Sequence, residues 1–138
     1  MIVLDASFLI KLVLEEKGSD TAEKLFKDWV IRGEDIVTVD IASSESFNAL
    51  WKHYTLLKDL DRSTLNEASK DLLTLWNKLS IIPTAEVVYK ALDISIKYNI
   101  TIYDSLYLAL TQLYKAALAT FDQRQREIAI KLGLKIYP

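Results

Sequence analysis

The sequence contains no cysteine and only one histidine, His53. The absence of cysteine excludes disulfide bridges, thiolate metal sites and cysteine nucleophiles. A single imidazole also excludes paired-histidine acid–base catalysis and any site that needs two or three histidine ligands. Any chemistry must therefore depend on oxygen groups and on the nitrogens of other side chains.

The chain also lacks any run of eighteen apolar residues, and its N-terminus has neither a basic region nor a small-residue cleavage site. We therefore expect a cytoplasmic protein without a membrane segment. Hydrophobic residues make up 51% of the 138 positions, which is enough to build one core. We expect a single domain over residues 1–138.

Charge of one sign is not in strong excess, because the net charge is only −2. This value at first argues against a nucleic-acid partner. However, if four of the 19 acids lie in one metal-neutralised pocket, 15 acids remain against 17 bases. Charge thus allows a phosphate-bearing partner without requiring one.

The first informative stretch is MIVLDASFLIK at residues 1–11. Residues 2–4 form a short apolar run typical of a strand buried on both faces, and the spacing after Asp5 becomes helical. Asp5 and Ser7 therefore fall in the passage from strand to helix, where open α/β sheets bind ligands. A carboxylate beside such an apolar strand loses hydration and needs helix-start donors or a cation.

The same pattern returns near the C-terminus. Residues 116–120 predict a buried strand, and a helix follows from about residue 123 to 132. Asp122 thus repeats the placement of Asp5, although a helix N-cap is the more common role for such an aspartate. Residues 134–137 predict a final strand.

Two further acids lie near the starts of predicted helices. Glu45 is early in a helix expected over residues 43–57, where Asn48 and Lys52 share its face. Asp104 lies in the first turn of a helix with almost no polar side, which predicts burial on nearly all sides. A solvated face for Glu45 and a capping role for Asp104 are the ordinary explanations, and spacing alone does not exclude them.

Between these segments the sequence predicts a helical hairpin and an edge strand. A helix opened by a Thr64–Glu67 capping box would pack against the helix before it. Residues 80–83 predict either an edge strand or an extended segment, since Pro83 cannot donate to a ladder, and Thr84 is expected to cap the next helix. The alternation of strands and helices favours a three-layer α/β/α sandwich with a central parallel sheet of four to five strands.

In such a sheet all strand-to-helix junctions open at one edge. Asp5 and Asp122 would lie at two junctions, and the helices that carry Glu45 and Asp104 can reach the same edge. Four converging carboxylates repel one another unless a cation lies between them, and Mg²⁺ or Mn²⁺ prefers oxygen ligands. Convergence of the acids would therefore imply a divalent metal site.

Four segments together resemble the PIN-domain family and, within it, the VapC-like toxins of type II toxin–antitoxin pairs. These segments are VLDASFLIK, DIASSESFNAL, IYDSLYLALT and LATFDQRQREIAIKLGLKI. The similarity spans the whole chain and keeps the order of the acids, and the ordered combination is more specific than any single motif. The stretch before Glu45 departs from the commoner aliphatic pattern through Ser43 and Ser44.

The resemblance implies a metal-dependent endoribonuclease that acts as a toxin, with one or two Mg²⁺ or Mn²⁺ ions activating a water for attack on an RNA phosphodiester. The family's catalytic and metal-binding acids match Asp5, Glu45, Asp104 and Asp122. Its supporting polar positions match Ser7, Asn48 and Thr120. The family further implies an RNA substrate, a small antitoxin protein that covers the active groove, and a homodimer.

Four cations are candidates for contacts with RNA phosphates, although a solvated surface is the ordinary role for each: Lys11, Lys52, Arg124 and Arg126. Other functions stay open. A haloacid-dehalogenase-type hydrolase would need a second aspartate where Ser7 stands, and a receiver-type signalling domain would need a lysine after the strand at 116–120. The chain could also be a non-catalytic binding or dimerisation module, or a PIN nuclease of RNA processing without a toxin role.

Overall fold

The computed structural model describes residues 1–138 and places five strands among seven α-helices, with a π-helical segment, η1, that continues α3. In chain order the elements are β1 (Ile2–Leu4), α1 (Ala6–Val13), α2 (Ser19–Ile31), β2 (Ile36–Val39), α3 (Ala42–Lys52), η1 (His53–Leu57), α4 (Arg62–Trp76), β3 (Ser80–Ile82), α5 (Thr84–Tyr98), α6 (Ile102–Leu113), β4 (Ala117–Ala119), α7 (Gln123–Lys131) and β5 (Lys135–Tyr137).

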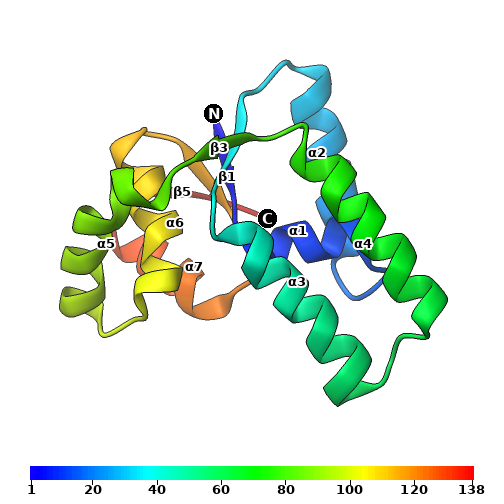
Figure 1. Cartoon of the computed structure of the whole chain (residues 1–138). Helices are drawn as coiled ribbons and strands as arrows, with labels where there is room; N and C mark the ends of the chain where they lie inside the picture. Colours follow the sequence, from blue (N-terminus) through cyan, green and yellow to red (C-terminus); the bar gives the residue numbers. More distant parts are fainter.

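The strands form one sheet in the order β3-β2-β1-β4-β5, and every neighbouring pair is parallel. Because crossovers between parallel strands are right-handed, α1 to α4 cover one face while the chain moves from β1 to β3. The chain then crosses back, so α5 to α7 cover the other face. Figure 1 shows these two groups of helices on opposite sides of the sheet. The predicted α/β/α sandwich is confirmed, with five strands.

The strand order reverses between β1 and β4, and this reversal positions the site. From β1 the chain proceeds through β2 to β3, whereas from β4 it proceeds to β5 in the other direction. Leu4 pairs with Ala119 at the ends of the two strands, and the Asp5 N–H donates to the Ala119 carbonyl at 3.2 Å. Asp5 and Thr120 therefore leave the sheet side by side, at the point where open α/β sheets bind ligands.

The core lies on both faces of the three central strands. All residues of β1, β2 and β4 are buried, whereas the edge strands β3 and β5 are partly exposed. The one polar residue of these central strands, Thr38, donates its hydroxyl to the Leu4 carbonyl at 2.7 Å and so adds no unpaired group. The sequences of central strands in parallel sheets are short apolar runs because both faces of these strands are buried.

The helix α6 packs directly on the sheet, against β1, β2 and β4. It is buried continuously from Ser105 to Thr111, which confirms the predicted burial on nearly all sides. Asp104 precedes this buried stretch and is only partly exposed. The central helix of the second layer therefore begins with one of the candidate acids.

Two helix starts differ from the sequence prediction. The N-cap of α4 is Asp61, whose carboxylate accepts a hydrogen bond from the Thr64 N–H at 2.7 Å, so Thr64 itself is not the cap. The N-cap of α5 is Pro83, and Thr84 instead donates its hydroxyl to the Asp40 carboxylate. In both cases a nearby carboxylate, which accepts more strongly than a hydroxyl, determines the local geometry.

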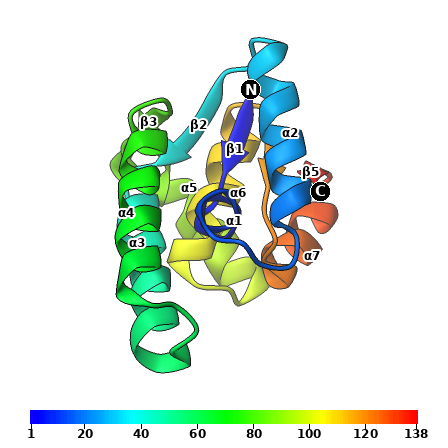
Figure 2. The same cartoon turned by 90° about the vertical axis from the view of Figure 1, so that its right-hand side faces the viewer.

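The predicted helical hairpin consists of α3 and α4, and Figure 2 shows it extending past the end of the sheet. The helix expected over residues 43–57 is regular only to Lys52 and then widens into the π-helix η1. His53 begins that segment, with its Nδ1 atom 3.0 Å from the Asp59 carboxylate and its Nε2 atom 3.7 Å from Glu16. None of the helices combines the length and apolar character that a membrane crossing requires.

Candidate active site

Four helices begin near the carboxyl ends of the central strands, and each has a candidate acid at its N-terminus. Asp5 caps α1 and Asp122 caps α7, whereas Glu45 and Asp104 lie in the first turns of α3 and α6. A helix N-terminus carries a partial positive charge, so each carboxylate is stabilised by the helix that it begins. Asp122 is thus the N-cap of α7, as expected, and it also lies at the candidate site.

Asp5 lies deepest of the four, with 2% of its surface exposed. Its carboxylate accepts hydrogen bonds from the Phe8 N–H at 2.8 Å and from the Ser7 and Thr120 hydroxyls, each at 2.7 Å. Burial raises the pKa of Asp5 to about 6, the three hydrogen bonds oppose that rise, and the negative charge of Asp122 adds to it. Asp5 is therefore a buried acid whose charge is only partly compensated.

The two predicted hydroxyl residues join Asp5 to the turn that carries Asp122. The Ser7 hydroxyl accepts the Phe121 N–H at 2.9 Å, and the Thr120 hydroxyl accepts the Asp122 N–H at 3.0 Å. Each hydroxyl thus donates to Asp5 while it accepts from the β4–α7 turn. These bonds hold the first and last of the four candidate acids together across the strand reversal.

Gln125 joins Asp122 to the third acid, Asp104. Its backbone N–H donates to the Asp122 carboxylate at 2.7 Å, and its side-chain amide donates to Asp104 at 3.3 Å. The other Asp104 oxygen accepts from the Thr101 hydroxyl at 2.8 Å. The Gln125 side chain is 2% exposed, and its Oε1 atom has no partner.

Gln125 was not expected at the site from the sequence. The available signal was a glutamine three residues after an N-cap aspartate, where the side chain usually turns back to its own helix N-terminus. In the structure that side chain reaches a different helix, which no local pattern indicates. Gln125 is one of two residues not expected from the sequence that form hydrogen bonds to a candidate acid on another helix.

Tyr107 is the second such residue, and it contacts the fourth acid, Glu45. Its hydroxyl donates to Glu45 Oε1 at 2.9 Å, although the tyrosine is only 1% exposed. Burial raises the pKa of Glu45, the bond from Tyr107 opposes that rise, and the charge of Asp104 adds to it. From the sequence this helix was expected to have almost no polar side, so its tyrosine was not treated as a site residue. The missed signal was that a buried tyrosine hydroxyl needs a partner.

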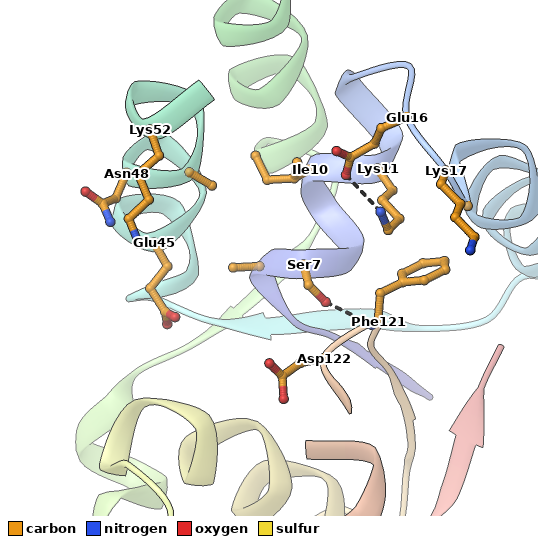
Figure 3. Close-up of a pocket in the computed structure, with 13 residues that line it drawn as sticks. Ser7, Ile10, Lys11, Glu16, Lys17, Glu45, Asn48, Lys52, Phe121 and Asp122 are labelled. Carbon is orange, nitrogen blue, oxygen red and sulfur yellow. Dashed lines mark hydrogen bonds and ion pairs between the residues drawn. The ribbon is translucent and has the colours of Figure 1, made fainter. Parts of the chain in front are cut away.

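A hollow of about 720 Å³ opens between α3 and the β4–α7 turn, over the first turns of α1. Figure 3 shows Glu45 and Asp122 pointing toward the same end of this hollow, with Lys52 and Lys17 farther along its two walls. Asn48 lies one turn beyond Glu45 on α3 and lines the same wall. The hollow therefore has an acidic end and a basic end.

Two of the four predicted phosphate-contacting cations line the hollow. Lys52 makes no ion pair, whereas the Lys11 ammonium is 2.8 Å from Glu16 and 5.0 Å from the centre of the Phe121 ring. Lys17 also lines the hollow, and the sequence analysis did not include it. The two lysines that are free of carboxylate partners thus stand on opposite walls.

The other two predicted cations, Arg124 and Arg126, do not line the hollow. Arg124 donates to the Tyr98 carbonyl at 2.8 Å, and Arg126 donates to the Pro138 carbonyl at 2.9 Å. Their guanidinium groups therefore join α7 to the end of α5 and to the C-terminus.

The candidate acids have no cationic partner, although several exposed acids elsewhere on the chain also lack one. The acids that are in at least one ion pair all lie outside the site, namely Glu16, Glu23, Asp28, Glu34, Asp59 and Glu127. No three acidic or histidine side chains are grouped closely enough to hold a metal ion by themselves. The donor set nevertheless fits Mg²⁺ or Mn²⁺ in kind, because it consists of carboxylate oxygens, one of them buried without a counter-charge.

Comparison with known proteins identifies the family of this chain. The profile of the PIN domain matches residues 2–131. This chain belongs to the PIN-domain family. Ribonuclease VapC3 of Pyrobaculum aerophilum is 33% identical to this PIN domain over 142 residues, which cover 99% of this chain and 98% of the relative.

Solved structures of proteins from other organisms share the fold of this chain. VapC20 of Mycobacterium tuberculosis, described as a sarcin-ricin loop cleaving toxin, has a TM-score of 0.69 at 15% identity over 92% of this chain and 94% of its own. A toxin–antitoxin complex from Klebsiella pneumoniae has a TM-score of 0.65 at 15% identity over 91% and 89% of the two chains. VapBC2 of Rickettsia felis, bound to promoter DNA, has a TM-score of 0.67 at 16% identity over 99% and 98%. The resemblance seen in the sequence is confirmed.

Proposed function

We propose that this PIN domain is the toxin endoribonuclease of a toxin–antitoxin pair and hydrolyses RNA phosphodiester bonds with the help of Mg²⁺ or Mn²⁺. The observation that carries the proposal is the group of four acids without cationic partners at four helix N-termini beside the strand reversal. Whole-length similarity to a protein named ribonuclease VapC3 supports the nuclease activity, and similarity to toxin–antitoxin structures supports the toxin role.

We assign Asp5, Asp104 and Asp122 to metal binding, with Glu45 as a further ligand or as the group that orients the attacking water. A bound Mg²⁺ or Mn²⁺ supplies positive charge to the phosphate and lowers the pKa of a water molecule. Glu45 suits the second role because one of its oxygens is held by a hydrogen bond and the side chain borders the hollow. No histidine base is required.

The hydroxyl and amide residues support these acids. Ser7 and Thr120 fix both oxygens of Asp5, which keeps its carboxylate in one orientation. Asn48 borders the acidic end of the hollow, where its amide can donate to a phosphate oxygen. We keep Lys52 and Lys11 as the proposed RNA phosphate contacts, whereas Arg124 and Arg126 stay predictions from the sequence.

The test is cleavage of single-stranded RNA by the purified protein with Mg²⁺ or Mn²⁺. We expect activity that EDTA abolishes and that Asp104→Asn lowers by about a hundredfold or more, since the substitution removes a charged ligand. Asp93→Asn is the matched control, because Asp93 is an exposed acid on the neighbouring helix α5. Equal activity of Asp104→Asn and Asp93→Asn would contradict the assignment.

Expression in cells tests the toxin role. The wild-type chain should arrest growth, co-expression with the small protein encoded beside it should relieve the arrest, and Asp104→Asn should not arrest growth. RNA cleavage without growth arrest would instead indicate a PIN nuclease of RNA processing. Absence of both would indicate a non-catalytic binding or dimerisation module.

We also propose that residues 1–138 form a single domain that assembles as a homodimer and binds a small antitoxin protein. One continuous core cluster supports the single domain. Exposed apolar side chains on the hairpin support protein contacts there, namely Trp51, Leu56, Leu57 and Leu73. Light scattering of the purified chain should give twice the mass of one protomer, and a mass of one protomer would contradict the dimer.

A further inference from the structure

The buried stretch of α6 carries a single tyrosine, Tyr107, one turn after Asp104. Residues three apart on a helix share a face, so the phenol and the Asp104 carboxylate project from the same side of α6. Tyr107 is 1% exposed, and a buried hydroxyl is costly unless it is hydrogen-bonded. Its only side-chain partner is Glu45, which belongs to another helix and another layer of the fold.

The bond between these residues has a defined direction. A phenol has one proton, and the Tyr107 hydroxyl donates it to Glu45 Oε1 at 2.9 Å. That carboxylate oxygen is thus fixed as an acceptor, whereas no hydrogen bond within the protein engages Glu45 Oε2. The bond therefore restricts the side chain to orientations in which the second oxygen is free.

The packing of α3 makes this bond important for the site. Helix α3 packs against α1 and α4, on the face of the sheet opposite to α6. The hydrogen bond from Tyr107 thus joins the acid of α3 to the helix that presents Asp104. Burial raises the pKa of the Tyr107 phenol, and the charges of Glu45 and Asp5 add to that rise, so the phenol lies near two of the four acids.

We propose that Tyr107 is a positioning residue of the metal site: it holds one oxygen of Glu45 and leaves the other for the ion or its water. This inference rests on the proposed function, because it assumes that Glu45 faces a bound divalent cation. Tyr107 itself does not touch the substrate or the ion. Its contribution is to keep the acid of the α3 layer aligned with the acids of the other helices.

The direct test compares Tyr107→Phe with Tyr103→Phe, an exposed tyrosine of the same helix that has no hydrogen-bond partner in the protein. Calorimetric titration with Mn²⁺ alone should show about tenfold to a hundredfold weaker binding for Tyr107→Phe, the usual cost of losing a residue that orients a ligand. Tyr103→Phe should bind Mn²⁺ like the wild type. In RNA cleavage, the Mn²⁺ concentration for half-maximal rate should rise, while the KM for RNA stays unchanged.

A second variant tests whether Tyr107 acts through Glu45. Glu45→Asp keeps the charge but shortens the side chain by one methylene, so the carboxylate retreats from the phenol. If the phenol acts only by holding Glu45, adding Tyr107→Phe to Glu45→Asp should weaken Mn²⁺ binding little further. Full additivity of the two losses would overturn the inference.

The outcomes separate this inference from the proposed function. A wild-type protein that binds Mn²⁺ and cleaves RNA, with Tyr107→Phe binding Mn²⁺ equally well, would overturn the positioning role alone. A variant that merely unfolds at lower denaturant concentration, with unchanged Mn²⁺ affinity, would also overturn it and leave a structural hydrogen bond. A wild-type protein that neither binds Mn²⁺ nor cleaves RNA would overturn both.

Discussion

The Asp5 carboxylate combines burial, three hydrogen-bond donors and a nearby acid, Asp122. In the unfolded chain its pKa would be near the ordinary 3.8, whereas folding raises it to about 6. Between these values the folded protein holds a proton that the unfolded chain releases. The contribution of Asp5 to stability is therefore largest below about pH 4 and declines as the pH rises through about 6.

We expect Asp5→Asn to gain stability relative to the wild type as the pH rises, because it cannot ionise. The difference in unfolding free energy should shift in favour of the variant by roughly 2–3 kcal/mol between pH 4 and pH 7. Urea denaturation in EDTA at several pH values measures it. Asp93→Asn should show no such shift, and a wild-type-to-Asp5→Asn difference that does not change with pH would contradict the expectation.

Gln125 makes a second prediction at the scale of one residue. Gln125→Met keeps the volume and the backbone N–H that caps α7, but it removes the amide that donates to Asp104. We expect about tenfold slower RNA cleavage with little change in the denaturation midpoint. Gln123→Met, at an exposed position two residues earlier, should cleave RNA normally. A Gln125→Met rate equal to that of Gln123→Met would rule out a role for the amide.

Sequence patterns indicated the candidate acids and the family resemblance added the hydroxyls of Ser7 and Thr120, but neither indicated the contacts of Tyr107 and Gln125 with those acids. Asp5 and Asp122 follow buried apolar runs, so their placement depends on local periodicity alone. Tyr107 and Gln125 act through contacts between separate helices, and one residue's neighbours in sequence do not specify such contacts. In the sequence alone, a tyrosine in an apolar helix is typical of the core, and a glutamine near a helix start is typical of the helix surface.

At the scale of elements, the connection between α1 and α2 forms part of the wall of the hollow. Gly18 has a φ of +96°, and a Cβ atom there would lie 2.8 Å from the Phe121 ring and 3.2 Å from Lys11. A side chain at this position would therefore be strained in its backbone and would displace the ring.

Gly18→Ala should thus lower both stability and RNA cleavage. The unfolding free energy should fall by about 1–3 kcal/mol, the usual range for a non-glycine residue in a left-handed conformation with added crowding. Gly133→Ala is the matched control, since Gly133 has a φ of +68° but no atom within 4 Å of the added Cβ. Thermal denaturation and RNA cleavage check both variants, and normal cleavage by Gly18→Ala would contradict the link to the hollow.

Most elements were predictable because their apolar periodicity is strong. The short β-branched runs at β1 and β2 and the almost wholly apolar α6 fall into this group. Helix starts were less predictable. Thr64 and Thr84 were expected to cap α4 and α5, but the Thr64 N–H donates to Asp61 and the Thr84 hydroxyl donates to Asp40. The π-helical turn at η1 was not predictable, because it carries the same apolar spacing as a regular helix.

At the scale of the whole molecule, the candidate site is assembled from positions 5 to 122 of the chain by the order of the strands. From the alternation of strands and helices, the four acids were expected at one edge of the sheet; all four lie at helix N-termini, but no three of them are grouped closely enough to hold a metal ion by themselves. The sequence did not predict which side chains would point into the hollow, because that depends on how α3 and the β4–α7 turn approach each other. Consequently Lys17 was missed, and Arg124 and Arg126 were favoured although they bond to backbone carbonyls instead.

The N-termini of α1, α3, α6 and α7 all lie at the candidate site, so we expect a variant without the four acids to bind RNA without cleaving it. If amides replaced all four acids, four positive helix ends would remain with no negative charge to oppose them, and such ends attract phosphate groups. Fluorescence anisotropy in EDTA should then show tighter binding of RNA by the quadruple variant than by the wild type. Because that variant would bind RNA without cutting it, it could be used to isolate the RNA that we propose this protein cleaves.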